Sequence, residues 1–178
     1  MITHPIGKFE PRPSPLSADT RSDLIARLTS APARLREALA RLSPGGMDVP
    51  YREGGWTPRQ IVHHMADSHV IGFIRIKRAL NEDEPRVFAY DPDDWVGRAD
   101  ADGAPAEASL RILDGVHDRM GRLLEALSSG DFARSLQHPT SGSVDVDFLL
   151  QLYTWHGDHH RAQIEALATR LAGGDPST

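Results

Sequence analysis

The chain contains no cysteine among its 178 residues. It therefore has no disulfide bond, no thiolate metal ligand and no cysteine nucleophile of its own. Long apolar runs are also missing, because none approaches the ~20 residues that a membrane-spanning helix needs. The segment Met1–Pro15 carries prolines where a signal peptide has its apolar stretch. We therefore expect a cytoplasmic protein that does not bind a membrane.

A basic surface is lacking as well. The chain has 20 lysines and arginines against 25 acidic residues, a formal net charge of -5, and its arginines are scattered. We therefore expect no nucleic-acid partner. The length is sufficient for one domain with a real core, and we find no internal repeat. Residues 1–178 are accordingly treated as a single domain.

Hydrophobic spacing predicts two long amphipathic helices in the first half of the chain. The first covers residues 17–42, and Pro32 inside it predicts a kink or two short helices that meet there. The second covers residues 57–80. Thr57 as N-cap, proline at the first helical position and Gln60 three residues later form a capping box.

The second half of the chain predicts two further helices. One runs from about residue 105 to 130. The other is capped by Asp145 or Asp147, runs to about residue 171 and ends at Gly173–Gly174. With four helices and no convincing strand, we predict an all-α four-helix bundle. The order of the helices around the bundle is not determined by these patterns.

Three segments lie outside the predicted helices. Residues 1–16 are proline-rich and predict an extended arm that packs through Ile6 and Phe9. Residues 81–104 form a long connection after the second helix, and its aromatics indicate that it packs down and could wall a substrate cleft. Residues 131–144 are predicted to be a loop. The aromatics that could line a cleft are Phe88, Tyr90 and Trp95 in the connection, and Trp56 and Trp155 elsewhere.

Three of the nine histidines are candidates for a metal site. His156 and His160 are four residues apart, so a helix places them on one face, roughly 6 Å apart at Cβ. This face is otherwise apolar and should point inward. Two buried imidazoles side by side are costly without a shared partner, and a metal supplies one. His64 lies on the inward face of the second helix, so two faces together supply three imidazoles, as in metal sites of helix bundles.

The other histidines have more ordinary interpretations. His117 and His138 are expected to be hydrogen-bonded core residues, because buried polar groups normally find partners. His4 lies in the arm and is expected to be solvated. Surface or outer-shell positions are expected for three that fall on other helical faces: His63, His69 and His159.

Several motifs resemble the YfiT group of the DinB superfamily, whose members are provisionally called metal-dependent hydrolases. The main ones are residues 50–69, which include Gly54-Gly55-Trp56-Thr57-Pro58, and residues 155–160. The arm and His138-Pro139 are also similar, so the resemblance covers nearly the whole chain. It implies a four-helix bundle, a homodimer and one divalent metal per chain. Its implied ligands are the three that the helical spacing selects: His64, His156 and His160.

The outer shell of this site is predicted to differ from that of the YfiT group. Where the group has further histidines in the last helix, this chain has Asp158 and Gln163. Metal-bound imidazoles usually donate their other N–H to a carboxylate, carbonyl or water. Asp67, three residues after His64, is therefore a candidate orienting residue or general base, with an exposed surface charge as the alternative. Gln163, three residues after His160, is a candidate hydrogen-bond donor to the far side of that ligand.

Three neutral imidazoles predict an open, cationic zinc or nickel site, since imidazole suits both metals. Water there becomes a nucleophile, and a thiol is held as thiolate. The superfamily includes S-transferases that use mycothiol, bacillithiol or glutathione, and YfiT-like members are associated with bacillithiol. Because the protein has no cysteine, a thiol must arrive as cosubstrate. We favour thiol transfer to a small molecule over hydrolysis. A non-catalytic, metal-stabilised dimeric bundle, closed by a fourth protein ligand such as Asp67 or Gln163, is the alternative.

Overall fold

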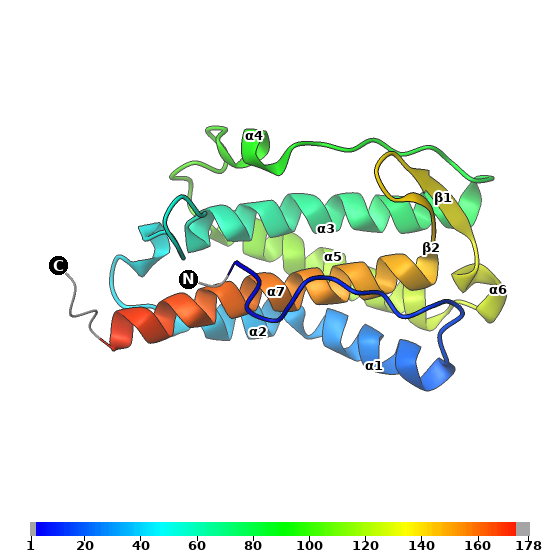
Figure 1. Ribbon diagram of the computed structural model, residues 1–178, viewed down its shortest axis with the longest axis horizontal. Helices are drawn as coiled ribbons and strands as arrows, with labels where there is room; N and C mark the ends of the chain where they lie inside the picture. Colours follow the sequence, from blue (N-terminus) through cyan, green and yellow to red (C-terminus); the bar gives the residue numbers. More distant parts are fainter. Residues whose placement is uncertain (1–2, 174–178) are drawn as a thin grey trace.

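A computed structural model describes residues 3–173, so Gly174 of the predicted helix stop lies outside the described residues. Four helical columns run side by side, and α1 and α2 together form the first of them (Figure 1). The predicted four-helix bundle is confirmed. The elements are α1 (Ala18–Thr29), α2 (Ala31–Ala40), the 3-10 helix η1 (Gly46–Asp48), α3 (Pro58–Asn81), α4 (Pro92–Val96), α5 (Glu107–Glu125), α6 (Ser129–Phe132), β1 (Ser135–His138), β2 (Gly142–Asp145) and α7 (Val146–Ala172).

Side-chain caps determine where α3 and α7 begin. The Thr57 side chain accepts a hydrogen bond from the Gln60 backbone N–H at 3.2 Å, and the Gln60 side chain accepts one from the Thr57 N–H at 3.0 Å. This is the predicted capping box. The Asp145 carboxylate accepts from the Phe148 N–H at 2.7 Å. Asp145 is therefore the N-cap of α7, whereas the other candidate, Asp147, is buried inside the helix.

The first column is interrupted at Ser30, between α1 and α2. Pro32 stands in the first turn of α2, where its missing N–H leaves no intrahelical bond unmade. The carboxylate of Asp158 on α7 pairs with Arg27 of α1 at 2.5 Å and with Arg34 of α2 at 2.8 Å. Both halves of the column are thus held against the same helix. The prediction of two short helices near Pro32 is confirmed.

The connection between α3 and α5 sets the order of the columns. Residues 82–106 run back along the length of the bundle, so α3 and α5 point in the same direction (Figure 1). The α1–α2 column packs against α5 and α7, and α3 packs against the same two helices. The first column and α3 therefore occupy opposite corners of the bundle.

A β-hairpin occupies much of the segment predicted as a loop. β1 pairs antiparallel with β2, and Leu136 and Val144 are partners that are both buried. Gly142 takes a positive φ of 70° at the start of β2, which suits a glycine. The backbone of Gln137 also exchanges hydrogen bonds with Pro85 and Val87 of the connection, at 3.0 and 3.1 Å. The loop prediction is wrong here, because short strands gain their stability from these pairings rather than from local sequence.

The arm lies extended along α7 (Figure 1). Phe9 packs edge-on against Phe148, with ring centroids 5.4 Å apart, and the Arg12 N–H donates to the side chain of Gln151 at 2.8 Å. Ile6 stays 43% exposed. The arm therefore packs on the bundle through Phe9, as predicted, but not through Ile6.

Buried apolar side chains form two clusters, one toward each end of the bundle. On α5, His117 falls between Leu113 of one cluster and Met120 of the other. We call the buried band between the clusters the histidine layer, and it consists of His64, His69, His117, His156 and His160. The hairpin-end cluster includes Leu28, Phe73, Ile76, Met120, Leu149 and Tyr153. The α2-end cluster includes Leu35, Ile61, Met65, Leu113, Ile164 and Leu167.

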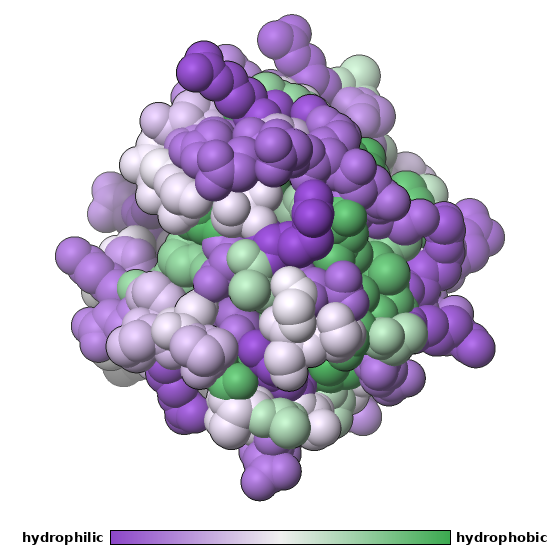
Figure 2. All heavy atoms as spheres, turned by 90° about the vertical axis from the view of Figure 1, so that its right-hand side faces the viewer, coloured by the Kyte–Doolittle hydropathy of each residue, from purple (hydrophilic) through white to green (hydrophobic). Residues whose placement is uncertain are grey.

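The surface is mainly polar at the end that carries the hairpin and α6. Hydrophilic side chains surround this end, and hydrophobic ones gather toward the right-hand side of the view (Figure 2). Within residues 3–173, no helix combines the length and the apolarity that crossing a bilayer would require.

Candidate metal centre

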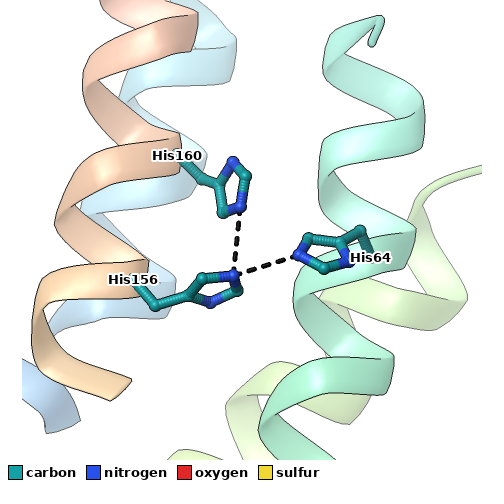
Figure 3. Close-up of side chains that lie close together, drawn as sticks. All are labelled: His64, His156 and His160. Atoms are coloured by element: carbon teal, nitrogen blue, oxygen red, sulfur yellow. Dashed lines mark hydrogen bonds between the residues drawn. The ribbon is translucent and has the colours of Figure 1, made fainter. Parts of the chain in front are cut away.

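His64 of α3 and His156 and His160 of α7 point toward one another across the bundle (Figure 3). Nε2 of His156 lies 3.0 Å from Nε2 of His64 and 3.1 Å from Nε2 of His160. One ring nitrogen from each residue lies within 4.8 Å of the others. The structure therefore brings together the three histidines that helical spacing selected.

Gln163 determines which nitrogen of His160 carries the proton. The Gln163 amide N–H donates to the Thr3 carbonyl oxygen at 3.3 Å, so its Oε1 is the atom that lies 2.8 Å from His160 Nδ1. Because a carbonyl oxygen only accepts, His160 Nδ1 must donate, and Nε2 presents a lone pair to the centre. Gln163 thus lies beside a candidate ligand as expected, but it accepts from the ligand rather than donating to it.

Burial keeps the three imidazoles neutral. Loss of hydration lowers the pKa of His64 to about 4. The same burial, reinforced by repulsion from neighbouring imidazoles, lowers the pKa of His156 and of His160 well below the ordinary histidine value. The neutral imidazole is the form that binds a metal. The site is therefore prepared for a metal at neutral pH without first releasing protons.

A divalent ion fits this set of donors. Nitrogen ligands about 2.0–2.1 Å from a tetrahedral metal lie about 3.3–3.4 Å from one another. Nε2 of His156 lies at 3.0 and 3.1 Å from the other two nitrogens, close to this separation. Without a metal, His156 Nε2 faces two ring nitrogens, and a neutral imidazole has one proton at most to share. Between residues 3 and 173, no further histidine or carboxylate joins the cluster. Three protein ligands would leave a coordination position open, as in catalytic zinc sites.

A cavity of about 280 Å³ lies beside His160. The indole of Trp56 covers two of the histidines, with ring centroids 4.6 Å from His64 and 6.0 Å from His160. Its Nε1–H donates to the Asp93 carboxylate of α4 at 2.8 Å. Trp56 and the connection therefore form one wall of the cavity, and Arg52 contributes another charge to its lining.

The other aromatics that could line a cleft lie elsewhere. Tyr90 and Trp95 pack against each other with centroids 4.4 Å apart and planes tilted by 38°, and Phe88 is 59% exposed. Trp155 stacks on His159 at 4.7 Å and lines a separate cavity of about 210 Å³. Of the five candidates, Trp56 is the one that lines the cavity at His160.

Asp67 lies on α3 with part of its side chain exposed. It makes no hydrogen bond to His64, His156 or His160 within the described part of the chain. Burial raises the pKa of Asp67, and repulsion from Asp100 adds to the rise. A group with a raised pKa can exchange a proton more readily near neutral pH. Its role as orienting residue or general base stays a prediction.

Three histidines for which surface or outer-shell positions were predicted are all buried. His63 contacts the Ser109 hydroxyl at 2.8 Å. His159 Nε2 accepts from the Gln163 amide at 2.9 Å. Nε2 of His69 lies 3.0 Å from Nδ1 of His156. The surface alternative is therefore wrong, and His69 and Gln163 are the residues that contact the far nitrogens of candidate ligands.

The remaining histidines differ from one another. His117 is a hydrogen-bonded core residue, as predicted, because its Nδ1–H donates to the Leu28 carbonyl at 2.6 Å. His138 is a partly exposed hairpin residue whose Nδ1 accepts from Thr140, so the core prediction is wrong for it. His4 lies with its ring 5.6 Å from His159 and lines the cavity, rather than being fully solvated.

Comparisons with known proteins place this geometry in a family. A family model of the DinB superfamily matches residues 27–164. YfiT of Bacillus subtilis, provisionally named a metal-dependent hydrolase, is 38% identical over 171 residues, which cover 96% of each chain. A Bacillus licheniformis protein with the same provisional name is 41% identical over 173 residues, which cover 96% of this chain and 97% of the relative.

Solved structures agree with the sequence comparisons. The structure of YfiT from Bacillus subtilis is described as a probable metal-dependent hydrolase with an unusual four-helix bundle topology. It matches with a TM-score of 0.91 over 96% of this chain and 97% of that chain. TT2238, a four-helix bundle protein, matches with a TM-score of 0.56 at 19% identity over 79% of this chain and 94% of that chain, which supports the fold alone.

Proposed function

Since the chain belongs to the DinB superfamily, we propose that it is a metal-dependent enzyme whose zinc or nickel ion is held by His64, His156 and His160. The observation that supports this most strongly is the convergence of three Nε2 atoms, one of which belongs to His160, a residue that also lines a cavity. A metal site that only stabilised the packing of two helices would not need a cavity beside it. The cavity is large enough for part of a small substrate. The indole of Trp56, which donates a hydrogen bond to Asp93, packs against His64.

We further propose that the nucleophile is a low-molecular-weight thiol of the bacillithiol type. When bound, a divalent ion would supply positive charge that favours the deprotonated form of a thiol or a water. The protein has no thiol of its own, so the sulfur must come with a cosubstrate. Thiols built on cysteine carry amino and carboxylate groups. Arg52 and Asp93 both line the cavity and provide charges of both signs for such a molecule.

The experiment that tests this proposal supplies metal-loaded protein with a chromogenic aryl chloride and a thiol. The expected reaction forms a carbon–sulfur bond, breaks the carbon–chlorine bond and releases chloride and the thiol proton. It should require both metal and thiol. His64→Ala should abolish it, whereas His138→Ala, a change at a partly exposed histidine of the hairpin, should leave it unchanged. Equal rates with and without metal would contradict the proposal.

Two other outcomes would identify alternative functions. The provisional name of the relatives favours hydrolysis, and metal-dependent turnover of esters or amides without thiol would establish it. A bundle in which metal raises the melting temperature, but which transfers no thiol and hydrolyses nothing, would be a metal-stabilised structural protein.

We also propose that the protein is a homodimer. Apolar side chains remain exposed on two neighbouring helices: Ile74 of α3 is 50% exposed and Ile112 of α5 is 45% exposed. Exposed apolar groups of this kind are common at subunit interfaces. Light scattering should give about twice the 19.6 kDa mass of one chain. A single-chain mass at micromolar concentration would contradict the homodimer.

A further inference from the structure

His69 contacts the nitrogen of His156 that faces away from the other two candidate ligands. Its side chain is fully buried, at 0% exposure, and its Nε2 lies 3.0 Å from His156 Nδ1. His156 therefore has its two ring nitrogens engaged on opposite sides. Nε2 faces His64 and His160, and Nδ1 faces His69.

The direction of this hydrogen bond follows from the chemistry of imidazole. A neutral histidine carries one ring proton. If His156 is to offer the Nε2 lone pair to a metal, its proton must be on Nδ1, which then donates to His69 Nε2. In the other tautomer, His69 donates and the proton of His156 sits on Nε2, where it blocks the centre. The direction of the hydrogen bond between His69 and His156 therefore decides whether His156 can act as a ligand.

The ring of His69 is held firmly in this position. It stacks on His117, with centroids 4.8 Å apart and planes 20° apart, and Tyr153 packs edge-on against it at 5.4 Å. His117 is itself fixed by its hydrogen bond to the Leu28 carbonyl. Tyr153 lies so close to Gly72 that a Cβ there would be 2.4 Å from the ring. His69 thus has little freedom to rotate away from His156.

Stability alone does not explain a histidine at this position. In the described part of the chain, the second ring nitrogen of His69 and Nε2 of His117 are buried without a hydrogen-bond partner. Unpartnered buried polar atoms destabilise a fold. An apolar side chain at position 69 would avoid this cost while joining the flanking apolar clusters. A role that needs a nitrogen at this place accounts for the histidine.

We propose that His69 is a positioning residue that accepts the Nδ1 proton of His156 and so keeps the Nε2 lone pair of His156 directed at the metal. His117 supports this role by stacking on the ring of His69. Partners of this kind commonly orient metal-bound histidines. The inference rests on the proposed metal site but not on the reaction that occurs there.

Two variants of similar size test the proposal. His69→Gln keeps an acceptor oxygen near the position of Nε2, whereas His69→Met removes it. We expect His69→Met to weaken zinc binding by about 10- to 100-fold, and His69→Gln to restore most of the lost affinity. The metal-free His69→Met protein should melt close to the wild type, because removal of the unpartnered Nδ1 of His69 offsets the loss of its hydrogen bond to His156.

Nitrogen NMR of the His156 ring gives a readout that does not depend on activity. In zinc-loaded wild type and His69→Gln, the Nδ1–H of His156 should show the downfield proton shift of a hydrogen-bonded imidazole, and in His69→Met this shift should be lost. If wild type binds zinc and His69→Met binds it equally well, the proposal is wrong. A lower melting temperature with unchanged affinity would show a merely structural role. If wild type itself binds no zinc, the metal site is at fault rather than the role of His69.

Discussion

The histidine layer and the two apolar clusters beside it are built from the same four helical columns, but they are stabilised in different ways. In the clusters, side chains such as Leu149 and Ile76 are buried at 0–1% exposure and need no polar partner. In the layer, five imidazoles are buried together, and each ring nitrogen needs a donor, an acceptor or a metal. The comparison indicates that the apolar clusters contribute most of the folding free energy, which offsets the cost of burying the imidazoles in the histidine layer.

The two regions also differ in how they respond to protons. The apolar clusters contain no group that titrates near neutral pH, whereas burial lowers the pKa values of His64, His69 and His156 in the layer. Changes made in one region should therefore leave the properties of the other largely intact. The following predictions test this separation, in order of expected size.

The largest expected effect follows from damage to an apolar cluster. Leu149→Ala should lower the free energy of unfolding by about 3 kcal/mol, through lost burial and the cavity left behind. Denaturant unfolding would measure this. Zinc affinity at low temperature should be unchanged, because Leu149 belongs to the hairpin-end cluster rather than the layer. Ile6→Ala, at a side chain that is 43% exposed, is the control and should cost less than about 1 kcal/mol.

An intermediate effect should come from acidification of the metal-free protein. Because burial lowers the pKa of His64 to about 4, the unfolded chain binds more protons than the native one between about pH 6.5 and 4. Stability should therefore fall as the pH is lowered through this range. His64 alone should contribute about 2 kcal/mol between about pH 7.5 and pH 5.

The contribution of His64 can be isolated with a matched variant. On acidification from about pH 7.5 to pH 5, metal-free His64→Gln should lose about 2 kcal/mol less stability than metal-free wild type. Both proteins should be measured by denaturant unfolding at the same series of pH values. If the free energy of unfolding changes with pH in the same way in both proteins, burial does not lower the pKa of His64.

A smaller effect is expected where the layer meets the interrupted column. Asp158→Asn should lower stability by about 1–2 kcal/mol, because the buried carboxylate pairs with Arg27 and Arg34. Solvent screening limits the value, since Arg27 is 54% exposed. The exposed pair of Asp118 and Arg122 is the control, and Asp118→Asn should have no measurable effect. An equal change in both variants would show that Asp158 contributes no more than a surface charge.

The features that could be predicted from sequence are the local ones. The Thr57–Gln60 capping box and the break at Pro32 depend on residues within one turn, so short-range rules find them. Two of the candidate ligands could also be predicted, because His156 and His160 are four residues apart and share one helical face. The family resemblance then selected the same residues without adding a geometric argument.

The features that could not be predicted depend on packing. The β1–β2 hairpin has strands of four residues, which gain their stability from pairing with each other and with the connection. His69 was assigned to the surface or outer shell because it falls off the apolar stripe of α3. However, α3 packs against both α5 and α7, so a wider arc of its surface is buried than a single stripe predicts. The contact between His69 and His156 could be predicted only if the order of the helical columns around the bundle were known, and the sequence does not determine that order.

The central claim is that the histidine layer holds one divalent metal ion through three side chains. The most direct test is metal analysis and zinc titration of purified protein, in parallel with His64→Ala, His156→Ala and His160→Ala. Wild type should bind one ion per chain, and each single variant should lose most of it while keeping its helical content, because both apolar clusters remain. The claim would be contradicted if a variant with all three histidines changed to alanine bound as much metal as wild type.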